Sequence, residues 1–154
     1  MKNIFILGFI LFLNGCIKER VGHTKSFITN TTTHTITIHP YYGATLDNSN
    51  IKIVNPNSTA EVYKLNPRGK TIDPCFGTLL QQYDSVLIIY DDVVKIPHIK
   101  FNLTYTGNHK ILFSNNRSIS NADHWTKLIT NETKYSLEGN FTYVFVEQDY
   151  LDAK

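Results

Sequence analysis

The chain has 154 residues, a length that favours one domain with a hydrophobic core of its own. Its 15 Lys and Arg residues stand against 13 Asp and Glu residues and are scattered singly along the sequence. Nucleic-acid-binding domains concentrate basic residues in a stripe, so we expect no nucleic-acid partner. Because there are only two cysteines, Cys16 and Cys75, the domain is expected to depend on its core and not on a set of disulfides.

The first sixteen residues have the layout of a secretory signal: a positive start, an apolar stretch over residues 4–13, and a small residue before Cys16. The apolar stretch is shorter than the roughly 20 residues that cross a bilayer as a helix. Leu13-Asn14-Gly15-Cys16 resembles the lipobox of bacterial lipoproteins, in which the cysteine sulfur receives a diacylglyceryl group. The resemblance implies a signal peptide over 1–15, lipidation of Cys16, and membrane attachment through acyl chains such as palmitate.

Residues 16–26 are expected to form a lipidated tether, because they carry charged side chains and few apolar ones. The domain itself is expected to span residues 27–154. Acidic runs follow the cysteine in some surface-exposed lipoproteins, whereas Lys18-Glu19-Arg20 has a single acid. The sequence therefore leaves open which face of the membrane the protein occupies.

Alternation of β-branched and polar residues predicts strands over 27–29 and 33–39, the second ending at Pro40. A loop containing Tyr41 and Tyr42 follows, and further strands are expected over 51–54 and 59–65. Residues 70–83, which contain Cys75, have no clear period.

The run 86–90 is apolar on both faces and predicts a central strand that is covered on both sides. After a turn at Asp91-Asp92, strands are expected over 93–96, 99–105 and 110–113. A short helix is predicted to begin at Asn121, with Trp125, Leu128 and Ile129 on one face. The remaining elements are expected to be strands over 134–137 and 141–146, a turn at Gly139-Asn140, and an acidic tail over 147–154.

Many short strands, frequent turns and almost no helix predict an all-β fold. We expect an antiparallel β-sandwich, immunoglobulin-like or related, with at most one short helix. The aromatic residues of 99–105 and 141–146 would supply its core.

Two features resemble a family of small uncharacterised lipoproteins of Bacteroidetes. One is Asp84-Ser85-Val86, whose apolar run leads into Asp91-Asp92, and the other is the ending Glu147-Gln148-Asp149-Tyr150-Leu151-Asp152-Ala153 after an aromatic strand. The resemblance covers most of residues 27–153 and implies a cell-envelope lipoprotein, anchored in the outer membrane. The family carries no assigned activity. Asp84-Ser85-Val86 also fits a short O-glycosylation motif of that phylum, and the start of a strand explains it equally well.

Candidate chemistry is sparse. Cys75 beside a histidine would be a nucleophile with its base, but its neighbours match no protease signature, and a buried lone thiol behaves as a small hydrophobe. The six histidines include no His-x-His or i, i+4 pair, so no metal and no other cofactor is expected. Asp91 and Asp92 form an acid pair, although adjacent acids on a turn are better explained by hydrogen bonds to the local backbone.

Aromatic side chains on loops bind carbohydrate by stacking, and the candidates here are Tyr41, Tyr42 and Trp125. For Trp125 the alternative is a plug at the end of the core. We therefore expect a lipid-anchored, non-enzymatic binding or structural module whose partner is an envelope protein or a glycan. The alternative is a small envelope hydrolase that uses Cys75 or an acid pair.

Overall fold

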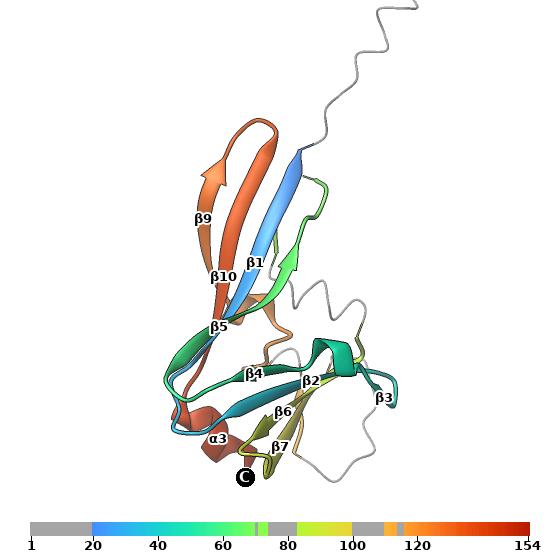
Figure 1. Ribbon diagram of the computed structural model, residues 1–154, viewed down its shortest axis with the longest axis vertical. Coiled ribbons are helices and arrows are strands. Elements are labelled where there is room, and N and C mark those ends of the chain that lie inside the picture. Colours follow the sequence, from blue (N-terminus) through green and yellow to red (C-terminus); the bar gives the residue numbers. More distant parts are fainter. Residues whose placement is uncertain (1–19, 70, 74–82, 100–109, 114–115) are drawn as a thin grey trace, which may run out of the picture.

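The computed structural model describes residues 20–69, 71–73, 83–99, 110–113 and 116–154. Their strands form two sheets, and one short helix, α3 (Glu147–Ala153), follows the last strand. The expected all-β, sandwich-like fold is confirmed. Figure 1 shows that one sheet extends well beyond the other, away from α3.

The extended sheet has four strands in the order β5-β1-β10-β9. Their bounds are Val21–Asn30 for β1, Ser58–Leu65 for β5, Thr126–Glu132 for β9 and Ser136–Phe145 for β10. β1 and β10 pair in parallel along their whole length, from Val21 opposite Ser136 to Asn30 opposite Phe145. This pair departs from the expected antiparallel arrangement, because the two strands come from opposite ends of the chain and are not joined by a hairpin.

The second sheet has six strands, in the order β3-β2-β6-β7-β8 with β4 also paired to β2. Their bounds are Ile36–Tyr42 for β2, Thr45–Leu46 for β3, Lys52–Val54 for β4, Ser85–Tyr90 for β6, Val94–Ile99 for β7 and Leu112–Phe113 for β8. β6 lies between β2 and β7, which confirms the central strand predicted from the apolar run 86–90.

The core lies where the two sheets face each other. The extended sheet contributes Ile28, Phe141, Tyr143 and Phe145, and the second sheet contributes Ile36, Ile38, Val86, Ile88, Tyr90 and Ile96. These aliphatic and aromatic side chains are almost completely buried, and their removal from water is the main stabilising contribution to the fold.

The first strand begins at Val21, so residues 21–26, expected in the tether, belong to the extended sheet. The inward side chains along this part of β1 are small or polar: Gly22, Thr24 and Ser26. Hydrophobic periodicity does not reveal such a strand. Only residues 17–20 separate Cys16 from the start of β1.

Pro40 does not end the second strand, because it lies buried inside β2. Its carbonyl oxygen accepts a hydrogen bond from the amide of Asp47 at 2.9 Å, so this side of Pro40 faces the edge shared by β3 and β4. β4 pairs with β2 up to Ile38, and β3 pairs from Tyr41 onward. Pro40 has no amide hydrogen to donate, and it lies between the two short partners β4 and β3, where the hydrogen-bond ladder is already interrupted.

The helix predicted from Asn121 is replaced by a single 3-10 turn, η2 (Ala122–His124), and by strand β9. Asn121 does cap this turn, because its side chain accepts a hydrogen bond from the amide of Asp123. Beyond it, the β-branched residues Thr126, Ile129 and Thr130 favour extended backbone. Leu128 and Ile129 are exposed as a result, whereas a helix would have packed them on the sheet.

Gly139 lies inside one continuous strand, β10, and not in the predicted turn. A Cβ atom at this position would be 2.4 Å from Cδ1 of Ile72, so glycine is required by close approach. The chain reverses at residues 133–135 instead, where the amide of Thr133 donates to the carbonyl of Ser136 at 2.8 Å.

The predicted acidic tail forms α3. Asp149, in its first turn, is 9% exposed and accepts hydrogen bonds from Nε of Arg117 at 2.6 Å and from the amide of Val146 at 2.8 Å. This pairing satisfies the carboxylate and ties α3 to the sandwich. Asp149, and with it the predicted tail, is therefore part of the fold.

The described part of the chain contains no helix that is long and apolar enough to cross a membrane. Most of the strand predicted over 99–105 lies outside the described residues, as do Cys16 and Cys75.

Candidate functional site

The outer face of the extended sheet carries the groove that we take as the candidate site. Along β1 the residues at even positions are buried and those at odd positions are more exposed, and along β10 the parity is reversed. The parallel register places His23 opposite Glu138 and Lys25 opposite Asn140. These side chains therefore share the face of the sheet that points away from the core.

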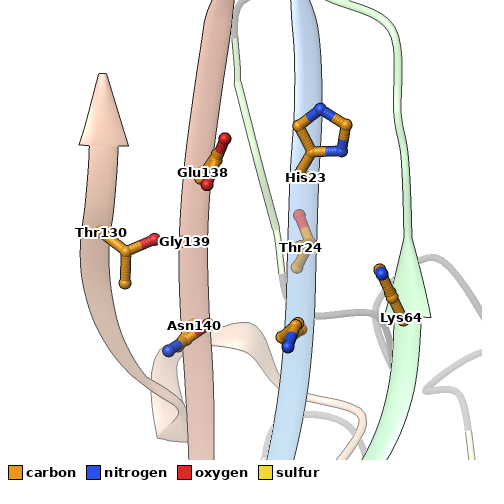
Figure 2. Close-up of a pocket in the computed structure, with 8 residues that line it drawn as sticks. His23, Thr24, Lys64, Thr130, Glu138, Gly139 and Asn140 are labelled. Atoms are coloured by element: carbon orange, nitrogen blue, oxygen red, sulfur yellow. The ribbon is translucent and has the colours of Figure 1, made fainter.

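Figure 2 shows the groove across this face, with side chains contributed by all four strands of the sheet. The lining comprises His23, Thr24, Lys25, Lys64, Thr130, Glu138, Gly139 and Asn140, around a volume of about 240 Å³. A register shift in β9 opposite Glu138 and Gly139 leaves Thr130 as an extra residue, which interrupts the ladder and bends this edge of the sheet.

Several groove side chains are held by neighbours on the same face. Nδ1 of His23 is 2.8 Å from Oδ1 of Asn66, and Nζ of Lys25 is 3.3 Å from a carboxylate oxygen of Glu61. Nδ2 of Asn131 donates to Oε1 of Glu138 at 3.3 Å. These contacts restrict the rotamers of the groove residues before any ligand arrives, which lowers the entropy cost of binding.

The groove mixes cationic donors, a carboxylate acceptor and neutral groups that both donate and accept. It is open and polar, and the described residues that line it include no cysteine or serine that would act as a nucleophile. This chemistry suits a hydrogen-bonding ligand that lies along the sheet. It offers little to a compact apolar ligand, which needs an enclosed apolar pocket.

Tyr41 and Tyr42 do not lie in the expected loop: they are the last two residues of β2 in the second sheet, where Tyr42 belongs to a separate cluster. Tyr42 is 44% exposed, and its ring lies 4.4 Å from that of the buried Tyr83. The hydroxyl of Tyr83 donates to Oδ2 of Asp47 at 2.6 Å, and Asp47 also caps the 3-10 helix η1 (Asn48–Asn50). Tyr42, the last residue of β2, therefore presents one exposed ring beside this ordered segment, while Tyr41, also in β2, is half-buried.

Hydrogen bonds from Ser49, Tyr83 and Asn50 hold the pKa of the Asp47 carboxyl below its usual range. Burial, together with the same hydrogen bond to Asp47, raises the pKa of Tyr83. The carboxylate and the neutral phenol are thus both fixed across the ordinary pH range. This cluster orders the loop and holds no group that is ready to transfer a proton near neutral pH.

Trp125 lies in the core, 6% exposed, and is not brought together with Tyr41 and Tyr42. Its Nε1 donates to the carbonyl oxygen of Ile119 at 2.9 Å, and its ring packs on Tyr143 with centroids 5.5 Å apart. This is the core-plug arrangement that the sequence left as the alternative. A buried indole has no free face on which a sugar ring can stack.

The acid pair at the β6–β7 turn is occupied by its own surroundings. Asp91 and Asp92 both have positive φ, as a tight turn requires, and the register leaves three residues between Tyr90 and Val94. The carboxylate of Asp91 accepts from the amide of Thr35 at 2.8 Å and lies 2.5 Å from Nδ1 of His34. The hydrogen bond with His34, which has the larger effect, and the one from the amide of Thr35 both lower the pKa of Asp91.

His34 is held on both sides. Its Nε2 is 3.3 Å from a carboxylate oxygen of Glu147 in α3, and its ring stacks on Tyr150 at 3.6 Å. In a catalytic Asp–His pair, the second nitrogen faces a nucleophile, whereas here it faces another carboxylate. His34 therefore joins β2, the β6–β7 turn and α3, and this geometry indicates a structural link.

Within the described residues, no group of three or more His, Cys, Asp and Glu side chains is placed to hold a metal ion. The groove residues were not among the candidates from the sequence. The available signal was the alternation of His23 and Lys25 with the small inward residues of β1, but only the pairing of the strands places them beside Glu138 and Lys64.

The fold and the groove define an all-β, sandwich-like protein with a polar site on an open sheet face. Comparison with known family models, curated proteins and solved structures found no match to the chain.

Proposed function

We propose that this chain is a lipid-anchored protein of the bacterial cell envelope, held in the outer membrane through Cys16, that acts as a non-enzymatic binding module. The observation that supports binding is the pre-ordered polar groove on the outer face of the extended sheet. The lipobox-like Leu13-Asn14-Gly15-Cys16 supports the anchor.

The ligand class that fits the groove is a hydroxyl-rich envelope glycan. A glycan has hydrogen-bond donors and acceptors along its length. The groove has complementary groups in the ammonium groups of Lys25 and Lys64, the carboxylate of Glu138 and the amide of Asn140. An envelope protein remains the alternative partner: binding to envelope proteins freed of glycan, with no binding to the glycan fragments, would favour it.

The binding experiment uses the full-length protein, purified in detergent, and glycan fragments released from the bacterial envelope. Isothermal titration should show binding to the wild type and a loss of about tenfold or more in the Lys64→Ala/Asn140→Ala double variant, because groove hydrogen bonds are removed. Lys95→Ala is the matched control, since Lys95 is an exposed lysine of β7 in the other sheet. Equal affinity of the double variant and the control would overturn the groove as the site.

The anchor is tested separately, by growing cells with a fatty-acid analogue. Wild-type protein should be labelled and Cys16→Ser should not. Equal labelling of the two proteins would exclude Cys16 as the lipid-bearing residue.

A further inference from the structure

The start of β1 lies at one extreme of the molecule, in a small surface that we call the tether end. It comprises Arg20, Val21, Arg68, Lys134 and Tyr135. The amide of Val21 donates to the carbonyl of Tyr135 at 2.9 Å, and the amide of Gly69 donates to the carbonyl of Arg20 at 3.0 Å. Backbone hydrogen bonds thus hold three separate chain segments together at this point. In Figure 1 the tether end is at the top, and α3 and the C-terminus are at the bottom.

The side chains of the tether end combine exposed apolar groups with cations. Tyr135 is 45% exposed and Val21 38% exposed, and Nζ of Lys134 lies over the Tyr135 ring at 5.2 Å from its centroid. Arg20 pairs with Glu132 at 2.8 Å, while Arg68 and Lys134 are exposed. Tyrosine beside lysine and arginine is the combination that membrane proteins place at the lipid–water boundary.

Chain length decides which end of the domain a lipid at Cys16 can reach. Four residues beyond Cys16 bring the chain to Arg20, and a fully extended chain covers no more than about 14 Å over that distance. The ten residues of β1 rise about 30 Å from Val21 to Asn30. A lipid on Cys16 therefore lies near the tether end and cannot reach the end that carries α3.

We infer that the tether end rests on the phospholipid surface in which Cys16 is anchored, so that the extended sheet stands upright with α3 directed away from the membrane. The partner is a bilayer containing anionic phospholipid, which attracts the cations of this end and accommodates the Tyr135 ring among its headgroups. This inference rests on the proposed lipid anchor. It adds an orientation in which the outer face of the extended sheet stands upright on the membrane. The groove on that face is then open to a ligand that approaches parallel to the membrane surface.

The test uses full-length, lipidated protein reconstituted into phosphatidylethanolamine/phosphatidylglycerol vesicles that contain brominated acyl chains, which quench nearby indoles. Tyr135→Trp places an indole at the tether end. Val93→Trp is the matched control, because Val93 is 76% exposed in the β6–β7 turn, near α3. Both variants retain the buried Trp125, and the wild type supplies its background signal. Thermal melts confirm that each variant is folded.

The added indole at residue 135 should be quenched at least about twice as strongly as the one at residue 93, because only the former reaches the lipid boundary. Adding Lys134→Glu and Arg68→Glu should reduce that quenching, whereas Lys95→Glu should not. Equal quenching at residues 135 and 93 would overturn the orientation. So would quenching at residue 135 that appears only after envelope protein is added to the vesicles.

Fatty-acid labelling of the same preparation separates the two proposals. Labelled protein with equal quenching at both positions overturns the orientation and leaves the anchor standing. Protein that carries no label overturns the anchor and, with it, the orientation that depends on it.

Discussion

The β1–β10 pair passes through two very different environments along its length. In the core half, residues 26–30 and 141–145, the inward side chains include Ile28, Tyr143 and Phe145, all fully buried against the second sheet. In the open half, residues 21–25 and 136–140, the inward positions are Gly22, Thr24, Leu137 and Gly139, and only Leu137 has a large apolar side chain. The backbone ladder is continuous, so the difference lies in the side chains.

This comparison shows which interactions hold each half. Large buried side chains stabilise the core half, at about 25 cal/mol per Å² of apolar surface removed from water. The open half depends on strand pairing, on the buried Leu137 and on close packing of its two glycines against Ile72. It is also where the polar groove lies, so the ligand-facing part of the sheet is the part with the smaller core.

The largest expected effect comes from the core half. Phe145→Ala removes a fully buried ring that packs against Tyr90, His98 and Tyr143, and it should lower the free energy of unfolding by about 3–5 kcal/mol. Urea unfolding followed by circular dichroism measures this loss. Val144→Ala, next to it on the outer face, should cost less than about 1 kcal/mol. Similar costs for the two variants would contradict the assignment of faces.

Acid should also destabilise the core half, through His98. Burial lowers the pKa of this ring to about 3, and its Nδ1 accepts a hydrogen bond from the amide of Ile119. The unfolded chain takes up a proton near pH 6.5, whereas the folded chain resists it down to about pH 3. The stability due to the neutral ring is therefore complete above pH 6.5 and is lost as the pH falls.

His98→Gln, which keeps an acceptor without a titrating ring, should show a shallower decline of stability with acid. The wild type should lose about 3 kcal/mol more than the variant between pH 7 and pH 4. Urea unfolding at several pH values measures both slopes. Parallel slopes would mean that His98 takes up its proton without unfolding.

A smaller effect is expected in the open half, at Gly139. Its added Cβ in Gly139→Ala would meet Cδ1 of Ile72 at 2.4 Å, and we expect a loss of about 1–2 kcal/mol. Ile72→Val removes that Cδ1 atom, so the same glycine substitution should cost less in the Ile72→Val background. A double-mutant cycle from thermal melts measures the coupling, and additive costs would argue against close packing at this point.

Sequence patterns predicted the strands that have one apolar and one polar face, and the strand whose two faces are both apolar. The run 86–90 became the central strand β6, and Phe141, Tyr143 and Phe145 share a buried face as expected. The patterns failed where inward residues are small. β1 from Val21 and β10 through Gly139 gain their inward packing from close backbone approach, which leaves no apolar period to detect.

The candidate site was harder to predict than the fold. Tyr41 and Tyr42 were expected in a loop and instead form the end of strand β2, where Tyr42 is an exposed aromatic beside Tyr83. The groove was missed, because His23 and Glu138 are brought together by parallel pairing of strands from opposite ends of the chain. Local periodicity contains no information on pairing at that separation, and each residue alone resembles an ordinary surface charge.

The smallest expected effect is on the edge strand β9. Leu128 is 62% exposed and lies opposite Asn140 on the outer face, so Leu128→Ser should change the free energy of unfolding by less than about 0.5 kcal/mol. Phe145→Ala and Leu128→Ser both truncate a large apolar side chain in the same sheet, and only the burial of that side chain differs greatly. If the leucine variant cost more than about 1.5 kcal/mol by urea unfolding, another part of the chain or a second copy would have to cover the outer face, and the groove would not be open.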